Sequence, residues 1–410
     1  MFVFITFRKI SKVNLRFLNI KIFAKMRDFC LKYFKKYLEN RIILMKIVYI
    51  ALKGMPLGGG IEKYTEELGS RLVKKGHKII VYCSPYYQTR NNEYKGMKIK
   101  ILPCINTKSL QKISLCFLAS LDQFLEKDID IVHYHAVGPS IFSFLPRMLG
   151  RKTVVQIHGI EWKRPKWGYL GKTFFKLSDL SAVYFPNKVT AVSKVLKDFY
   201  EKKFGREVVY IPTGVNKPIK RPPKKIKKFG LNGNDYIFFA ARLVPDKGCH
   251  YLIDAFNELK TDLKLVIAGD APHEEGYKRI LYEKAQGNRN IIFTGFIHGE
   301  LLEEFFSNAY IYVLPSEIEG LPISLLEAMS YGNCCVVSDI PENLEALGNY
   351  GYSFKSKDYK DLKRCLQTLI DKPELIYEKK KDVAEYVCKH YSWDKIADEF
   401  EQLYYEMLKN

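Results

Sequence analysis

Glu319 and Glu327 are two carboxylates separated by seven residues in the segment Glu-Gly-Leu-Pro-Ile-Ser-Leu-Leu-Glu-Ala-Met. The apolar, β-prone run 310–314 precedes them, so the chain is expected to pass from a buried strand through a loop into a helix with Pro322 at its first position. The free N–H groups and positive dipole end of such a helix start bind phosphate. A rise of about 1.5 Å per residue places Glu327 about 7.5 Å beyond Pro322 along the axis. We therefore expect Glu319 to reach sugar hydroxyls on one side of a diphosphate and Glu327 to accept ribose hydroxyls on the other.

Cations and glycines that follow two other expected strands could bind the same diphosphate. Arg242 and Lys247 lie just beyond the run 236–241, where a guanidinium fork and an ammonium can clamp two phosphates. The glycines 58–60 precede a predicted helix over 61–74 and allow a ligand to approach the backbone closely. Their spacing differs from G-x-G-x-x-G and the next strand ends without an acid, so NAD binding is not expected.

Histidines end two further expected strands, 130–135 and 153–158. Side-chain alternation places His133 and His135 on one face of the first strand, and His158 ends the second. Because parallel strands end at the same edge of a sheet, these histidines should open on one crevice. A hydrogen-bonded structural role remains the alternative for each of them, and most strongly for His133.

A loop over 157–168 contains two tryptophans and several cations. Trp162 and Trp167 can stack on sugar rings, and Arg164 can attract a phosphate. We interpret this segment as an acceptor loop, with packing between domains as the alternative. The pair Asp128 and Asp130 immediately precedes a buried strand, so it is predicted to form a turn rather than a metal site.

Short apolar runs alternate with helical patterns twice along the chain, which predicts two doubly wound α/β sheets. A Pro-rich cationic segment separates the two series and is typical of a linker. The expected strands are 46–51, 78–83, 130–135, 153–158, 188–192 and 208–211 in the first series, and 236–241, 263–268, 291–294, 310–314 and 334–338 in the second. The expected divisions are an extension over 1–44, a first domain over 45–217, a linker over 218–228, a second domain over 229–391 and a final helix over 392–410.

The formal charge of +21 is concentrated in the first half of the 410-residue chain. Residues 1–44 contribute +9, residues 45–220 contribute +17, and the remainder contributes −5. This asymmetry favours an anionic membrane surface or a pyrophosphate-bearing substrate. Nucleic acid is disfavoured as a partner because no binding motif accompanies the charge. The nine scattered cysteines indicate free thiols rather than disulfides or a zinc site.

Residues 1–44 mix apolar side chains with regularly spaced Lys and Arg. They are expected either to form a basic amphipathic segment on a membrane surface or to precede the true start of the protein at Met45. Charges interrupt the apolar core that a signal peptide requires. The absence of an apolar stretch of about 18 residues argues against a spanning helix.

Taken together, these motifs resemble the GT4 family of retaining glycosyltransferases with the GT-B fold. The carriers of the resemblance are the E-x7-E segment with its Glu-Ala-Met, the Gly-Gly-Ile-Glu run, the His-x-His strand end, Ile-His-Gly, Ala-Arg-Leu-Val-Pro-Asp-Lys-Gly and Thr-Gly-Phe-Ile. The resemblance implies the following roles. The reaction centre would hold His135, His158 and Glu319; the donor diphosphate would lie against Gly59, Gly60, Arg242, Lys247, Gly320 and Leu321; the ribose would bind Glu327; and the base would lie against Gly295, Phe296 and Ile297.

The resemblance further implies retaining transfer from a nucleotide diphosphate-sugar to a saccharide or lipid-linked saccharide, in surface polysaccharide or glycoconjugate synthesis. No metal and no other cofactor is expected, and the protein is expected in the cytoplasm, peripheral on the inner face of the cell membrane. Alternatives are another GT-B or nucleotide-sugar enzyme, such as a phosphorylase or an epimerase, and a non-catalytic membrane-binding scaffold. The sugar, nucleotide, acceptor and linkage stay open.

Overall fold

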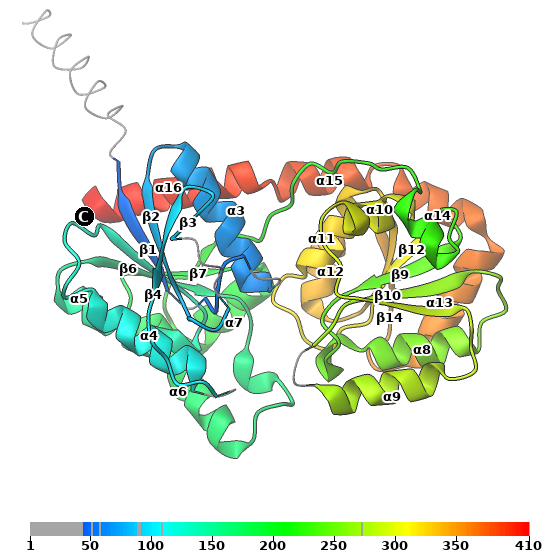
Figure 1. Ribbon diagram of the computed structural model, residues 1–410, viewed down its shortest axis with the longest axis horizontal. Coiled ribbons are helices and arrows are strands. Elements are labelled where there is room, and N and C mark those ends of the chain that lie inside the picture. Colours follow the sequence, from blue (N-terminus) through cyan, green and yellow to red (C-terminus); the bar gives the residue numbers. More distant parts are fainter. Residues whose placement is uncertain are drawn as a thin grey trace, which may run out of the picture. The chain divides into compact units, whose positions relative to one another are not determined.

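A computed structural model describes residues 44–409, apart from residue 51 and residues 57–58, 88–91, 108–109 and 272–273. The expectations for the N-terminal extension and for Gly58 therefore fall outside the described residues. Met45–Asn410 forms one compact unit, which contains two sheets with helices packed on both faces (Figure 1). No helix in the described part of the chain is long and apolar enough to cross a membrane.

The first sheet has eight strands in the order β3-β4-β2-β1-β5-β6-β7-β8, and every neighbouring pair is parallel except β3 with β4. Its central strands are buried on both sides because helices cover both faces. The strands are β1 (Lys46–Ile50), β2 (Lys78–Cys83), β3 (Glu93–Tyr94), β4 (Met97–Ile101), β5 (Ile131–His135), β6 (Lys152–Ile157), β7 (Lys188–Ala191) and β8 (Val209–Tyr210). The helices are α3 (Gly60–Lys74), α4 (Gln111–Asp122), η1 (Gly138–Phe142), α5 (Phe144–Met148), η2 (Glu161–Lys163), α6 (Tyr169–Tyr184) and α7 (Lys194–Phe204).

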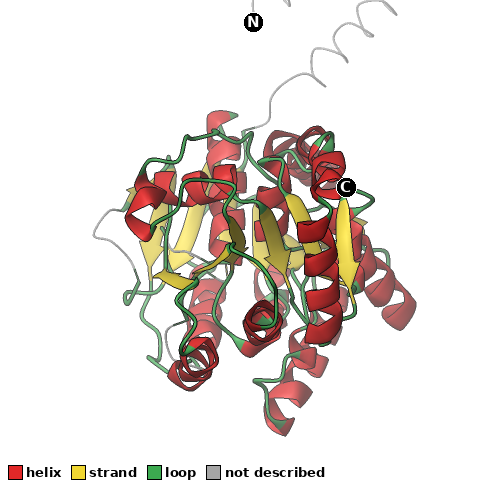
Figure 2. Ribbon diagram, turned by 90° about the vertical axis from the view of Figure 1, so that its right-hand side faces the viewer, coloured by secondary structure: helices red, strands yellow, loops and turns green. Residues whose placement is uncertain are grey.

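The second sheet is parallel throughout and has the order β11-β10-β9-β12-β13-β14. Figure 2 shows the strands lying between layers of helices. The strands are β9 (Tyr236–Ala240), β10 (Lys264–Ala268), β11 (Ile291–Gly295), β12 (Ile311–Leu314), β13 (Cys334–Ser338) and β14 (Gly351–Phe354). The helices are η3 (Lys225–Phe229), η4 (Pro245–Lys247), α8 (Cys249–Asn257), α9 (Glu275–Ala285), α10 (Glu300–Asn308), α11 (Ile323–Ser330), α12 (Pro341–Leu347), α13 (Tyr359–Asp371), α14 (Pro373–Lys380), α15 (Val383–His390) and α16 (Trp393–Lys409).

The expected α/β fold class with two doubly wound sheets is confirmed, and each of the eleven predicted strands has a counterpart in the structure. The strands that the sequence pattern missed, β3, β4 and β14, lie at or next to sheet edges. The position of Pro322 was predicted wrongly. It is the N-cap residue of α11, with φ −76° and ψ 106°, so the helix begins one residue later than expected.

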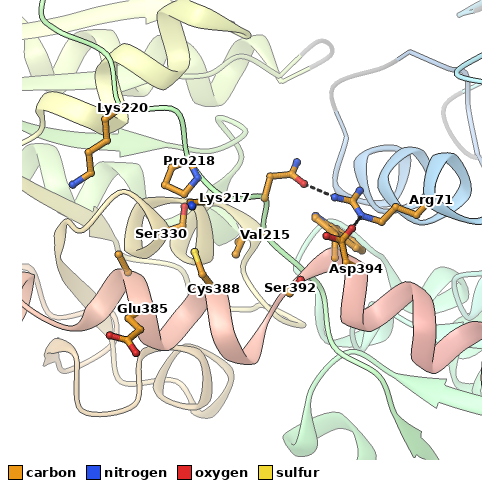
Figure 3. A pocket seen from close by; sticks show the side chains of 13 residues that line it. Arg71, Val215, Lys217, Pro218, Lys220, Ser330, Glu385, Cys388, Ser392 and Asp394 are labelled. Atoms are coloured by element: carbon orange, nitrogen blue, oxygen red, sulfur yellow. Dashed lines mark hydrogen bonds and ion pairs between the residues drawn. The ribbon is translucent and has the colours of Figure 1, made fainter. Parts of the chain in front are cut away.

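The chain returns to the first sheet through α16. The backbone N–H of Trp393 donates to the carbonyl of Val215, and α16 packs against α3. A cavity of about 630 Å³ lies beside this crossing, between the segment 215–220 and helices α15 and α16. Arg71 of α3 binds Asn216 and Asp394, all three of which line this cavity, and Figure 3 shows Arg71 and Asp394 at one end of it. None of the predicted site residues lines it.

Candidate active site

The starts of helices α3 and α11 meet, although they belong to different sheets. A Cβ atom added to Gly60, the first residue of α3, would lie 3.8 Å from Cδ1 of Ile323, the first residue of α11. Among the described residues, no side chain caps either helix, because the N-cap positions are Gly59 and Pro322. Two helix starts with free N–H groups and positive dipole ends therefore converge, which is an arrangement that binds an anionic group such as a diphosphate.

The loop that leads into α11 carries Glu319, whose carboxylate pairs with the ammonium of Lys247 at 2.5 Å. Both side chains are largely buried. A backbone hydrogen bond of 2.9 Å from Glu317 to Asp246 ties the same two loops together. The structure thus brings two predicted residues into direct contact, and Lys247 keeps further N–H groups for a phosphate.

Gly248 and Gly320 are positions where the site requires glycine. Gly248 has φ +67°, and a Cβ there would lie 2.0 Å from the carbonyl oxygen of Pro315. A Cβ on Gly320 would lie 2.0 Å from the carbonyl oxygen of His158. The loop before α11 lies directly against the end of strand β6. Only glycine, which has no Cβ atom, permits approaches this close. Leu321, the next residue, is buried.

Glu327 lies one turn into α11 and is influenced by charges on α3. Burial raises the pKa of its carboxyl to about 7; the charge of Lys63 acts in the opposite direction and that of Glu67 adds to the increase. Lys63 and Glu67 pair with each other at 2.7 Å. Near pH 7 this carboxyl is therefore protonated for part of the time. It can accept hydrogen bonds from hydroxyl groups when ionised, and it can also donate one when protonated.

Three histidines lie together at the ends of β5 and β6; His133 and His135 are buried, and His158 is partly buried. The ring of His135 stacks on that of His133 at 4.2 Å and lies 5.8 Å from that of His158, measured between centroids. His133 Nδ1 shares a hydrogen bond of 2.7 Å with the hydroxyl of Tyr404 in α16. Within the described part of the chain, neither ring nitrogen of His135 has a hydrogen-bond partner. Buried polar atoms of this kind point to a ligand that completes them.

All three imidazoles are neutral at physiological pH. Burial lowers the pKa of His133 and His135 well below the usual value, and it lowers the pKa of His158 to about 3. A neutral imidazole both donates and accepts a hydrogen bond, which suits sugar hydroxyls better than a cation would. In the described residues, no group of three or more His, Cys, Asp or Glu side chains is arranged to hold a metal ion.

The predicted acceptor loop is anchored at both ends. Trp162 donates a hydrogen bond of 2.9 Å from its indole to Asp179 of α6, and the ring of Trp167 lies 4.8 Å from that of Phe175. Arg164 pairs with Glu161 at 3.1 Å and with Asp246 of η4 at 2.7 Å. Arg164 therefore joins the loop to η4, which follows a strand of the second sheet. Both indoles contact residues of α6.

Arg242 and the expected base pocket lie at the strand ends of the second sheet. Arg242 is exposed, and no salt bridge to it is found in the described chain. Gly295 ends β11 with φ +70°, and its carbonyl accepts the backbone N–H of Gly269 at 2.9 Å. Phe296 is exposed and Ile297 is partly buried.

The structure adds residues that sequence reasoning missed. Burial lowers the pKa of His158, and the positive charge of Lys112 in α4 lowers it further. Tyr64 of α3 packs edge-on against His158 with centroids 4.9 Å apart, and its hydroxyl accepts the Gln156 amide at 2.8 Å. No local motif surrounds Lys112, but Tyr64 lies four residues after Gly60 and so shares its helix face.

Solved structures with this architecture belong to the GT-B class of glycosyltransferases. Sucrose-phosphate synthase from Thermosynechococcus elongatus matches with a TM-score of 0.77 and 18% identity, over 89% of this chain and 99% of its own. Anabaena HepE, solved in complex with UDP-glucose, matches with a TM-score of 0.74 and 18% identity, over 88% and 99%. At these identities the likeness establishes the fold.

Sequence comparison identifies the family. The model for Glycosyltransferase Family 4 matches residues 58–217, and that for glycosyl transferases group 1 matches residues 222–390. An uncharacterized glycosyltransferase of Methanocaldococcus jannaschii is 25% identical over 89% of this chain and 99% of its own length. The UDP-Gal:alpha-D-GlcNAc-diphosphoundecaprenol alpha-1,3-galactosyltransferase of Escherichia coli is 24% identical over 89% and 98%. The chain belongs to the group 1, or GT4, glycosyltransferases.

Proposed function

We propose that this protein is a retaining glycosyltransferase that transfers a hexosyl group from a nucleotide diphosphate-sugar to a saccharide or lipid-linked saccharide. The observation that carries the proposal is the meeting of the two uncapped helix starts, Gly60 of α3 and Ile323 of α11, beside the Lys247–Glu319 pair. Residues 45–217 would bind the acceptor and residues 229–391 the donor. The UDP-glucose complex of the structural relative HepE supports a nucleotide-sugar donor.

In this proposal the helix starts, Lys247 and Arg242 stabilise the charge that develops on the departing diphosphate. The bond between the anomeric carbon and the diphosphate oxygen breaks as the acceptor oxygen bonds to the same face of that carbon. The acceptor proton passes to the leaving phosphate oxygen, so no protein nucleophile is needed. Glu319 orients the donor sugar through the carboxylate oxygens that its contact with Lys247 leaves free.

The remaining site residues have positioning roles in the proposal. His135 and His158 offer neutral nitrogens to the sugar at the reaction centre. Glu327 accepts the ribose hydroxyls, and the backbone of Gly295, Phe296 and Ile297 lines the base pocket. The loop that carries Trp162, Arg164 and Trp167 forms one wall of the acceptor site.

We further propose a lipid-linked acceptor that the protein reaches from an anionic membrane surface, peripherally and from the cytoplasmic side. The diphosphoundecaprenol acceptor in the name of the E. coli relative supports this class of acceptor. The charge of +17 on residues 45–220 supports the anionic surface. Nucleic acid is not a proposed partner.

A thermal-shift screen of the purified protein against UDP-, GDP-, dTDP- and ADP-sugars tests the donor. One nucleotide should stabilise the protein clearly more than the others, and the effect should disappear in Lys247→Met. Anomeric analysis of the product formed with that donor tests retention. No stabilisation by any nucleotide-sugar, in a protein that unfolds cooperatively, would overturn the proposal.

A further inference from the structure

Helix α6 has its amphipathic pattern reversed, and helix α4 carries apolar side chains on its outer face as well as its inner face. The buried positions of α6 are Ser178, Asp179, Ser181, Ala182 and Val183, which are mostly small or polar. Its exposed positions include Leu170, Leu177, Leu180 and Tyr184, which recur at helical spacing along one stripe. A surface helix of a globular protein normally shows the opposite arrangement, with the apolar stripe facing the core.

Helix α4 also exposes apolar side chains. Gln111, Cys116 and Ser120 are buried there, whereas Phe117 and Leu121 are exposed, and exposed Phe124 and Leu125 follow the helix. Leu115, Cys116 and Ala119 form the apolar inner face of the helix. Two neighbouring helices with outward apolar stripes are not explained by packing within this chain.

These stripes belong to one surface. Helix η1 contacts both α4 and α6, and the rings of Phe117 and Phe142 join α4 to η1 at 5.3 Å. The rings of Phe144 and Phe185 join α5 to the end of α6 at 5.7 Å. Figure 1 shows α4, α5 and α6 on the same side of the first sheet. We define the α4–α6 apolar surface as the exposed side chains Phe117, Leu121, Phe124, Leu125, Phe144, Met148, Leu149, Tyr169, Leu170, Leu177, Leu180, Tyr184 and Phe185.

This surface holds 13 of the 24 large apolar side chains that are exposed in the described part of the chain. Its most open members, Tyr169, Leu170 and Leu125, are 84%, 83% and 80% exposed. Scattered single exposures are ordinary, but a contiguous group of this size marks a surface that meets a partner.

The charges around the surface indicate which partner covers it. Residues 144–185 contain eight Lys or Arg and two acids. Both acids are already neutralised: Glu161 pairs with Arg164, and Asp179 pairs with Lys203. Exposed cations, including Lys172 and Lys176, remain on α6 itself. Apolar side chains interleaved with cations are typical of segments that insert into an anionic lipid surface. A second copy of this chain would bring like charges together.

We propose that the α4–α6 apolar surface inserts into an anionic lipid bilayer and holds the acceptor side of the active site at that bilayer. The inference rests on the proposed function and deepens it, because it assigns the membrane contact to defined side chains. Lys112 at the start of α4 is close enough to His158 for its charge to add to the lowering of that residue's pKa, and the loop 157–168 runs from His158 to the start of α6. The starts of both helices therefore lead to the reaction centre, so a lipid-anchored saccharide could enter the site while its chain stays in the bilayer.

The test compares two triple variants of the full chain by vesicle flotation. Leu170→Ser, Leu177→Ser and Leu180→Ser remove the apolar stripe of α6 without touching a buried position. Ile280→Ser, Tyr282→Ser and Tyr377→Ser remove exposed apolar side chains from α9 and α14 and form the matched control. Phosphatidylglycerol and phosphatidylcholine vesicles are used at low and high salt, and thermal unfolding confirms that both variants fold.

Wild type and the control should float with phosphatidylglycerol vesicles, and the α6 variant should bind them at least roughly tenfold more weakly. The difference should persist at high salt, because salt screens the cations but not apolar insertion. Flotation of the α6 variant equal to that of wild type would overturn the proposal. The proposal would also be overturned if wild type did not bind vesicles but formed a dimer, and if the α6 variant were monomeric. The increase in melting temperature caused by the nucleotide-sugar should be the same in all three proteins. If wild type showed no such increase, the proposed function would be refuted rather than the membrane surface.

Discussion

Replacing Glu327 with glutamine should change how the stability of the protein depends on pH. Burial raises the carboxyl pKa from 4.5 to about 7, so the folded state binds a proton more tightly than the unfolded state. Wild-type stability should therefore fall as the pH rises from about 4.5 to about 7, and stay reduced above that range. The pKa difference corresponds to at most about 3 kcal/mol, an upper bound because the side chain is only partly covered.

Glutamine cannot ionise, so the stability of Glu327→Gln should not fall in this way as the pH rises. Urea unfolding of both proteins at about pH 5 and about pH 8 should show the variant gaining up to about 3 kcal/mol relative to wild type at the higher pH. Lys63 and Glu67 are the charged groups that act on this carboxyl, and both remain in the variant. Glu283→Gln, on an exposed position of α9, is the matched control. A variant-to-wild-type difference that is the same at both pH values would refute the reasoning.

Three further predictions concern the site, and a fourth concerns the charge of the chain. Glu327→Ala should weaken nucleotide-sugar binding by about 1.5–3 kcal/mol in a folded protein, and unchanged affinity by calorimetry would remove Glu327 from the site. Transfer should continue at a near-normal rate in excess EDTA, and activity restored only by Mg²⁺ or Mn²⁺ would contradict charge stabilisation by Arg242, Lys247 and the helix starts alone. Gly320→Ala should lower stability by about 1–3 kcal/mol and reduce activity, since its Cβ would meet the backbone of His158. In the control Gly276→Ala the added Cβ meets nothing within 4 Å, so stability should not fall. Equal melting temperatures of the two variants would count against the Gly320 contact. A chain that begins at Met45 should keep most of the salt-sensitive binding to anionic vesicles, at about 1 kcal/mol per basic residue near the surface, and binding by the longer chain alone would show that residues 1–44 are the anchor.

The sequence by itself determined eleven of the strands that the structure contains, the α/β class with two doubly wound sheets and the loops that carry the candidate site. These features are written in short windows: apolar runs such as 310–314, glycines before a helix, and two glutamates in one segment. The strand β4, next to a sheet edge, and the edge strand β14 were not predicted because their patterns are short or half polar. Burial on one side only leaves a weaker signal than burial on both.

The tertiary structure alone decided how those groups act on one another. Lys247 pairs with Glu319 across 72 positions of sequence, and His133 shares a hydrogen bond with Tyr404 across 271. The raised pKa of Glu327 depends on burial and on charges from α3, a helix of the other sheet. The outward leucines of α6 look like core residues in the sequence, because hydropathy gives the spacing of a helix face but not its direction. Which face a helix buries is set by what packs against it, and no local pattern contains that information.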